Sequence, residues 1–201
     1  MYSTKSNLCI GFHGCEKNRQ EKLISDASYY KMSQESFDWL GHGMYFWDNN
    51  EKRAMQWALD KKRAGKLEKP SVVGAVLDLG RCFDLLDNSH IDTLKKYYEL
   101  FKADFANLGL QMPENRDHPV STGDKVLREL DCAVIEYMHN TIEKNGYTPF
   151  DSVRAVFVEG KPIYPNAGFY DKSHIQICIR NPNCIKGVFL PRKSNSKYNN
   201  V

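Results

Sequence analysis

Apolar residues along the chain follow two periods, one typical of helices and one typical of strands. Helical spacing predicts four helices: residues 16–24, a segment capped by Asn49 or Asn50 and ending near 64, residues 89–108, and residues 126–145. Short apolar runs predict strands at 8–12, 72–79, 153–158, 174–180 and 185–190. Because strands occupy both ends of the chain and helices lie between them, we expect an α+β fold.

The segment HIQICIR, at residues 174–180, alternates strictly between apolar and other residues. Side chains in a strand point to opposite faces in turn, so the three isoleucines should share one face. Gln176, Cys178 and Arg180 should lie on the other face. A turn at 181–183 then separates this strand from the last one.

Length and composition indicate one globular domain. The chain has 201 residues, of which 41% are hydrophobic and 26% charged, as in ordinary soluble domains. We expect one domain over residues 1–191, followed by a polar, disordered tail over 192–201. No apolar run reaches the ~18 residues of a membrane span, and the N-terminal apolar stretch is too short for a signal peptide. A cytoplasmic location without membrane contact is therefore predicted.

Cysteine spacing and net charge indicate no metal and no particular partner. The six cysteines form neither a C-x-x-C pair nor a Cys/His cluster at zinc spacing, so we interpret most of them as buried apolar residues. The net charge of +3 neither requires nor excludes a nucleic acid partner.

Residues 37–47, FDWLGHGMYFW, combine five large aromatic residues with a Gly-His-Gly bend. Glycines inside such a segment indicate close approach of the backbone to another group. Two further places carry polar residues at strand ends or on strands: His13-Gly14 and Gln176. Each has an ordinary structural interpretation: a locally satisfied histidine, core packing around the bend, and a solvent-facing glutamine.

Taken together and in this order, the three segments resemble the ADP-ribosyltransferase superfamily, in its branch related to diphtheria toxin and the poly(ADP-ribose) polymerases. The matching segments are FHGC, with His13 and Gly14, GHGMYF, with Gly41, Gly43 and Tyr45, and HIQICIRNP. In the last segment Gln176 occupies the position of the usual glutamate. The resemblance covers the chain from about residue 8 to 190. It implies a split pair of antiparallel sheets, or sandwich, with an NAD cleft and flanking helices.

The resemblance also implies the roles of the site residues toward NAD, the co-substrate. His13 would hold the adenosine-side ribose, the backbone of Gly14 the nicotinamide carboxamide, and Tyr45 the cationic nicotinamide ring. Gly41 and Gly43 would bring the chain close to the dinucleotide.

The glutamate position differs from the family pattern. Gln176 can bond a ribose hydroxyl but carries no charge for the oxocarbenium-like state, so transfer of single ADP-ribose units is expected rather than polymer synthesis. Glu159, which ends the preceding strand, is either the base that activates the acceptor or an exposed turn residue. Arg154 and Arg180 either contact the substrates or form ion pairs, and His42 and His174 are interpreted as loop or strand-edge residues.

The leading hypothesis is therefore a mono-ADP-ribosyltransferase that modifies a protein or nucleic acid acceptor. Small free-standing members of the superfamily often act as toxins, effectors or defence components, which implies a possible neutralising antitoxin or immunity partner. Three alternatives stay open. They are an inactive module that binds NAD or ADP-ribose, a tRNA 2′-phosphotransferase, whose paired basic residues are not evident, and a cysteine hydrolase built on Cys15 and His13, whose spacing is poor for a nucleophile and its base.

Overall fold

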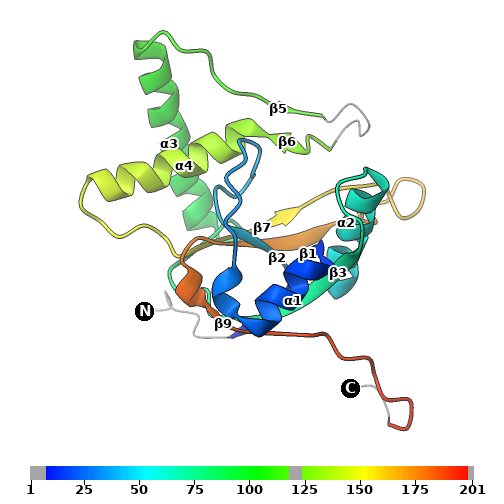
Figure 1. Ribbon diagram of the computed structural model, residues 1–201. Coiled ribbons are helices and arrows are strands. Elements are labelled where there is room, and N and C mark those ends of the chain that lie inside the picture. The colour runs from blue at the N-terminus through cyan, green and yellow to red at the C-terminus, as the bar shows by residue number, and fades with distance from the viewer. Residues whose placement is uncertain (1–7, 118–123, 199–201) are drawn as a thin grey trace.

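The computed structural model describes residues 8–117 and 124–198, and its centre is one seven-stranded sheet (Figure 1). The strand order is β4-β7-β8-β2-β1-β3-β9, and all neighbours are antiparallel except the parallel pair β4 and β7. The strands of this sheet are β1 (Cys9–Glu16), β2 (Met44–Asp48), β3 (Pro70–Leu77), β4 (Cys82–Asp84), β7 (Ser152–Phe157), β8 (His174–Ile179) and β9 (Ile185–Phe189). A separate antiparallel pair joins β5 (Asn115–Arg116) to β6 (Leu127–Arg128).

Helices cover both faces of the sheet. They are α1 (Lys17–Ser25), α2 (Glu51–Arg63), α3 (Asn88–Asn107) and α4 (Glu129–Lys144), with short 3₁₀ turns at Ala27–Tyr29 and Pro182–Cys184. In Figure 1, α3 and α4 pack together on one side of the sheet, and α1 lies on the other. Within the described residues, no helix is long and apolar enough to cross a membrane.

The α+β class expected from the sequence is confirmed, but the expected pair of sheets is wrong, because all seven strands belong to one sheet. Its two halves meet at a narrow joint, where β1 and β2 pair only through Gly11↔Asp48 and Phe12↔Trp47. Beyond Phe12, β1 continues along β3 as far as Glu16, while β2 stays beside β8. Where two separate sheets were expected, the structure has one sheet in which the neighbouring strands β1 and β2 separate after Phe12↔Trp47.

Three buried clusters form the core. The α1 face holds Phe46, Ile177 and Ile179, and the other face carries one cluster under α2 and one under α3 and α4. The isoleucines of β8 therefore face the opposite way from Cys178, as the alternation predicted.

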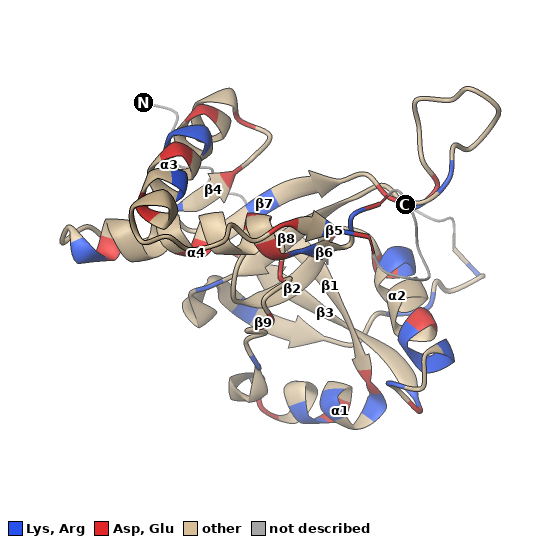
Figure 2. Cartoon of the chain, turned by 90° about the horizontal axis from the view of Figure 1, so that it is seen from above, with Lys and Arg blue, Asp and Glu red and all other residues tan. Residues whose placement is uncertain are grey.

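The four predicted helices are confirmed to within a few residues at their starts and ends. Asn50 caps α2, since its side chain accepts a hydrogen bond from the backbone N–H of Arg53 at 2.9 Å. Lysine and arginine fill the last turn of this helix, where positive charge is favourable to the helix dipole (Figure 2).

The first strand does not end at Phe12 as predicted, and β2, β4, β5 and β6 were not predicted. Residues 192–198, in the expected tail, contain neither helix nor strand.

Candidate functional site

The three segments that suggested a site lie on three adjacent strands. β2 carries the MYF end of the GHGMYF motif, whose first three residues lie in the loop before it, and is flanked by β1, with the FHGC motif, and by β8, with HIQICI. On the β8 side, Tyr45 lies opposite Cys178 and Trp47 lies opposite Gln176. Segments more than 160 residues apart in the sequence thus meet in the middle of the sheet.

His13 lies just beyond the last pair of the joint between β1 and β2. Its ring nitrogen Nδ1 is 2.8 Å from the carbonyl oxygen of Tyr45, which is left without a strand partner where the two strands separate. Burial lowers the pKa of His13 to about 4, so the ring is neutral at pH 7. Since a carbonyl only accepts, Nδ1 carries the proton and Nε2 is the acceptor. The ring packs near Phe46, at 5.9 Å between centroids.

Tyr45 holds the turn before its own strand. Its hydroxyl donates to the carbonyl of Gly41 at 2.8 Å and accepts from the backbone N–H of Leu40 at 2.9 Å. Gly41 has a φ of +80°, a conformation that favours glycine. The Tyr45 ring packs in the α3 and α4 cluster, and burial raises its pKa well above the ordinary value. Gly43 exchanges two backbone hydrogen bonds with Ser33.

The faces of the sheet separate His13 from the other two motif residues. The alternation along β2 places Phe46 on the α1 face, whereas Tyr45 and Trp47 point to the opposite face. Gln176 shares the Trp47 face, and the His13 ring lies on the Phe46 side. Tyr45 and Gln176 therefore lie on one face of the sheet. His13 lies on the other face, and its link to them is the hydrogen bond to the backbone carbonyl of Tyr45.

Gly14 is the point where β1 touches α2. A Cβ atom at this position would lie 2.4 Å from the carbonyl oxygen of Ala54 and 3.1 Å from the Trp57 ring. The residue is buried, and its lack of a side chain allows the helix to approach the strand.

Gln176 is oriented by an indole. Its Oε1 accepts from Nε1 of Trp39 at 2.6 Å, which leaves the side-chain NH₂ as its remaining donor group. The Trp39 ring packs against Phe157 at 4.9 Å, and the guanidinium of Arg128 lies over both rings, 4.4 Å from the Phe157 centroid and 5.1 Å from that of Trp39. An aromatic and cationic wall thus borders Gln176.

Glu159 is not an exposed turn residue, so that interpretation is wrong. Its side chain is only 16% exposed, and Oε2 accepts from Nη2 of Arg53 at 2.6 Å. Arg53 lies in the first turn of α2 and is itself 8% exposed. Two further guanidinium nitrogens of Arg53, Nε and Nη1, are buried without a hydrogen-bond partner among the described residues. The pair brings a carboxylate to the same face as Gln176.

His174 is buried, so its interpretation as a strand-edge residue is wrong. It begins β8, which lies between β7 and β2, and its ring is 5.4 Å from Phe157 and 6.0 Å from Trp47. Its Nδ1 is 2.7 Å from the carbonyl oxygen of Lys172, so Nδ1 carries the proton and Nε2 can only accept. Burial lowers its pKa to about 4. Neither Nε2 nor the nearby Nε1 of Trp47 has a partner among the described residues.

The two arginines with open roles form ion pairs. Arg154 contacts Asp48 and Asp84, each at 3.0 Å. Arg180 pairs with Glu136 and donates to the carbonyl of His42 at 3.1 Å. His42 itself lies in the loop before β2, with Nδ1 3.5 Å from Glu136. These groups stabilise the structure around the site.

The cysteines do not provide an activated nucleophile. None of the six forms a disulfide, and Cys15, Cys132, Cys178 and Cys184 are buried, as predicted for small apolar residues. Burial raises the pKa of Cys15 to about 11, which disfavours the thiolate that a cysteine hydrolase needs. Among the described residues, no group of three or more His, Cys, Asp or Glu side chains is arranged to hold a metal ion.

Three residues of the site were missed by sequence reasoning: Arg53, Trp39 and His174. Arg53 lies next to the apolar positions 54, 57 and 58 of α2. A cation at the edge of a buried helix face could have indicated a buried charged partner. His174 lies two residues before Gln176 in the alternating strand, so the alternation already indicated that both side chains share one face. No sequence signal indicated the bond between Trp39 and Gln176.

Comparisons of this chain with protein-family models, curated proteins and solved structures give no match.

Proposed function

We propose that this protein is an NAD-dependent mono-ADP-ribosyltransferase, which moves ADP-ribose from NAD to a protein or nucleic acid acceptor and releases nicotinamide. The observation that carries the proposal is the meeting of the three motif segments on β1, β2 and β8, beside the gap that opens after Phe12↔Trp47. The sheet with a local strand separation is our candidate for the NAD cleft that the family resemblance implies.

The reaction breaks the bond between ribose C1′ and the nicotinamide nitrogen, and the bonding electrons leave with nicotinamide. The acceptor then forms a bond to C1′ and loses a proton. Positive charge develops on the ribose, as in glycoside hydrolysis, and an adjacent carboxylate stabilises it. We assign this carboxylate, and the base for the acceptor proton, to Glu159, which pairs with Arg53 in the absence of substrate. The NH₂ group of Gln176 would donate to a ribose hydroxyl.

Buried polar atoms near Glu159 support a nicotinamide-bearing substrate. Arg53 and Trp47 present N–H donors without partners among the described residues, and His174 presents an acceptor nitrogen in the same condition. A carboxamide offers the complementary set, one carbonyl acceptor and one NH₂ donor. Because these atoms are covered, binding requires the Arg53 and Glu159 side chains to move. The hydroxyl of Tyr45 is bonded to the turn at Gly41, so we propose that Tyr45 holds this turn in position beside the site.

A second candidate is a module that binds NAD or ADP-ribose without turnover. It is favoured by Gln176, which lacks the negative charge of glutamate and whose carbonyl oxygen is already bonded to Trp39. The two candidates differ in whether the nicotinamide bond is broken.

The test is incubation of the purified protein with NAD, with and without a cell lysate, followed by chromatography of nicotinamide and ADP-ribose. Nicotinamide release that Glu159→Gln abolishes, and that Glu99→Gln on the exposed face of α3 leaves unchanged, would support the transferase. Saturable NAD or ADP-ribose binding without release would favour the binding module. If the protein neither releases nicotinamide nor binds NAD or ADP-ribose, both candidates are wrong.

A further inference from the structure

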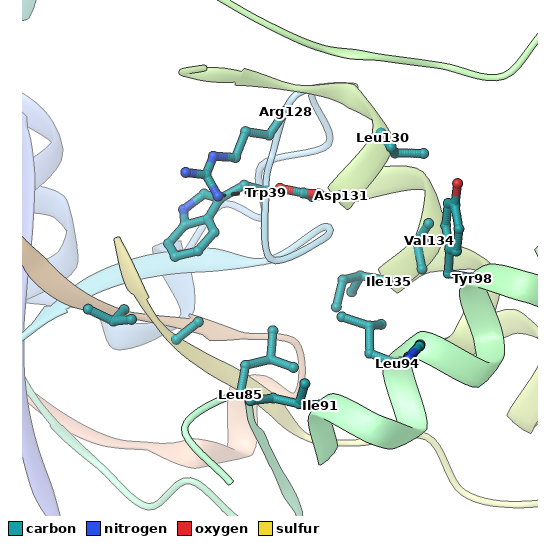
Figure 3. A pocket seen from close by; sticks show the side chains of 13 residues that line it. Trp39, Leu85, Ile91, Leu94, Tyr98, Arg128, Leu130, Asp131, Val134 and Ile135 are labelled. Carbon is teal, nitrogen blue, oxygen red and sulfur yellow. Dashed lines mark hydrogen bonds and ion pairs between the residues drawn. The ribbon is translucent and has the colours of Figure 1, made fainter. Parts of the chain in front are cut away.

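A cavity lies between α3, α4 and the end of β7, and it shares Trp39 and Arg128 with the wall that borders Gln176 (Figure 3). Its volume is about 420 Å³, within the range of small-molecule sites. The side chains around it are mostly apolar: Trp39, Leu85, Ile91, Leu94, Tyr98, Leu130, Val134, Ile135, Ala155 and Val156, with Lys95, Arg128 and Asp131. Figure 3 shows the side chains of Leu94, from α3, and Ile135, from α4, pointing toward one another. We refer to it below as the α3–α4 pocket.

One wall of the α3–α4 pocket is a sheet edge. β4 pairs with β7 only as far as Asp84↔Arg154, and the N–H of Leu85 then bonds the carbonyl of Arg154 at 2.8 Å. Groups two residues apart in a strand point the same way, so the backbone N–H and C=O of Val156 also point away from β8. Among the described residues, no strand pairs with β7 at this position. The apolar pocket therefore has a backbone donor at its margin.

The charges at the pocket do not balance. Asp131 accepts from Asn115 at 2.8 Å through Oδ1 and lies 3.4 Å from Arg128 through Oδ2. Arg128 is also stacked over Phe157 and Trp39. Two of the three charged residues that line the pocket are cations. Lys95 is exposed at the rim and forms no ion pair with any described residue, while the exposed acids Asp92 and Glu99 lie one turn away on α3.

We propose that the α3–α4 pocket binds a small organic anion, with an apolar body inside the cavity and a carboxylate or sulfonate at Lys95. The apolar walls favour burial of a hydrocarbon or aromatic body, at roughly 25 cal/mol per Å² of apolar area buried. Lys95 and the N–H of Val156 supply the few polar contacts that typically orient a ligand in such a site. Helices close two sides and the sheet closes a third, which suits a compact ligand better than an extended peptide. The proposal does not depend on NAD chemistry.

The test uses two dyes that share an apolar body and differ in charge. The anionic 1-anilinonaphthalene-8-sulfonate and the uncharged N-phenyl-1-naphthylamine are titrated into the folded protein, and dye fluorescence is followed at several ionic strengths. We expect saturable one-to-one binding of both dyes. Lys95→Ala should weaken binding of the sulfonate about fivefold, the upper range for an exposed charge pair, and leave the neutral dye unchanged. Lys96→Ala, at the neighbouring exposed lysine, is the matched control.

A filling variant locates the site. Ile91 lines the pocket and is 45% exposed, so Ile91→Trp can fill the cavity from its rim and should abolish binding of both dyes. Val156→Trp, from the opposite wall, serves if the first variant does not unfold cooperatively. Unchanged binding in the folded filling variant, or no binding by the wild type, would overturn the site. Equal binding of the sulfonate by Lys95→Ala and wild type would overturn the assignment of an anion.

Discussion

The guanidinium of Arg53 donates to the carboxylate of Glu159 at 2.6 Å, and this pair joins the first turn of α2 to the loop that follows β7. Both side chains are largely buried, at 8% and 16% exposed. A buried pair contributes through both partners, because removal of either one leaves an uncompensated charge in the interior.

We therefore expect Glu159→Ala to lower the free energy of unfolding by about 3–5 kcal/mol. Asp60→Ala, which removes an exposed pair with Arg63, should cost less than about 1 kcal/mol. Urea denaturation of both variants provides the comparison. In the double variant Arg53→Met with Glu159→Ala, much of the loss should be restored, and simple additivity of the two single effects would contradict direct coupling.

Gly14 sets the distance between β1 and α2. In Gly14→Ala the new methyl group would meet the backbone of Ala54, which cannot rotate away, so we expect a loss of about 1–3 kcal/mol of stability. Gly187→Ala on β9 meets no atom within 4 Å and should change stability by less than about 0.5 kcal/mol. Thermal and urea unfolding distinguish the two, and equal stability of both variants would disprove the close contact.

The hydroxyl of Tyr45 satisfies two backbone groups of one turn. Tyr45→Phe leaves the N–H of Leu40 and the carbonyl of Gly41 without this partner, and a loss of about 1–3 kcal/mol is expected. The control is Tyr137→Phe, whose hydroxyl bonds Asp104 at the surface and should matter less. Amide exchange at Leu40 should accelerate in the first variant only.

Stability should fall as the pH is lowered from about 6.5 to 4. Burial lowers the pKa of His13, His139 and His174 to about 4, below the ordinary value near 6.5 of the unfolded chain. In this window the unfolded chain binds more protons than the folded one, so the free energy of unfolding rises with pH by up to about 1.4 kcal/mol per unit for each histidine.

Urea midpoints between pH 4 and 7 measure this slope. A folded His174→Gln variant should show a smaller slope than wild type. The pKa of Glu136 is affected by burial, which raises it, and by Arg180 and the N–H of His42, which outweigh burial and lower it. Its contribution is lost below about pH 4.5, so it does not mask the histidines. If the His174→Gln variant has the same slope as wild type, His174 does not contribute to the pH dependence as predicted.

If the proposed transferase activity is correct, the charge at position 176 should control it. Gln176→Glu keeps an acceptor for the N–H of Trp39 and adds the missing negative charge, so nicotinamide release should increase by about tenfold or more, at the scale of one charged contact. Gln176→Ala should reduce release less than Glu159→Ala. Release by Gln176→Glu that does not exceed wild type would argue against a rate limited by this charge.

Periodicity predicted the elements that are long enough to display it. The four helices and the facing of the β8 residues follow from repeated apolar spacing, whereas β4, β5 and β6 are only two or three residues long and have no period. β2 was not predicted because its residues, MYFWD, do not alternate and follow directly after the Gly-His-Gly bend. β1 was predicted too short because its apolar run ends at Phe12, whereas the strand continues to Glu16 and packs closely against α2 at Gly14.

Sequence reasoning selected Gln176 and Glu159, and the structure places both on one face of the sheet. It did not select Arg53 or His174, because their burial depends on contacts between α2, β7 and β8 that no single segment displays. The assignment of His13 and Tyr45 to one site came from the family resemblance. Their bond runs from a ring to a backbone carbonyl, and only the local separation of β1 from β2 makes that carbonyl available.

The joint between β1 and β2 also has a mechanical consequence. It consists of two residue pairs, while β1 and β3 share eight pairs and β2 and β8 share four. Few backbone hydrogen bonds therefore cross this line, and side chains hold the two halves of the sheet together. The core cluster on the α1 face joins Phe46 and Ile177 to Val73 and Leu77, and the Arg53–Glu159 pair joins α2 to the loop after β7.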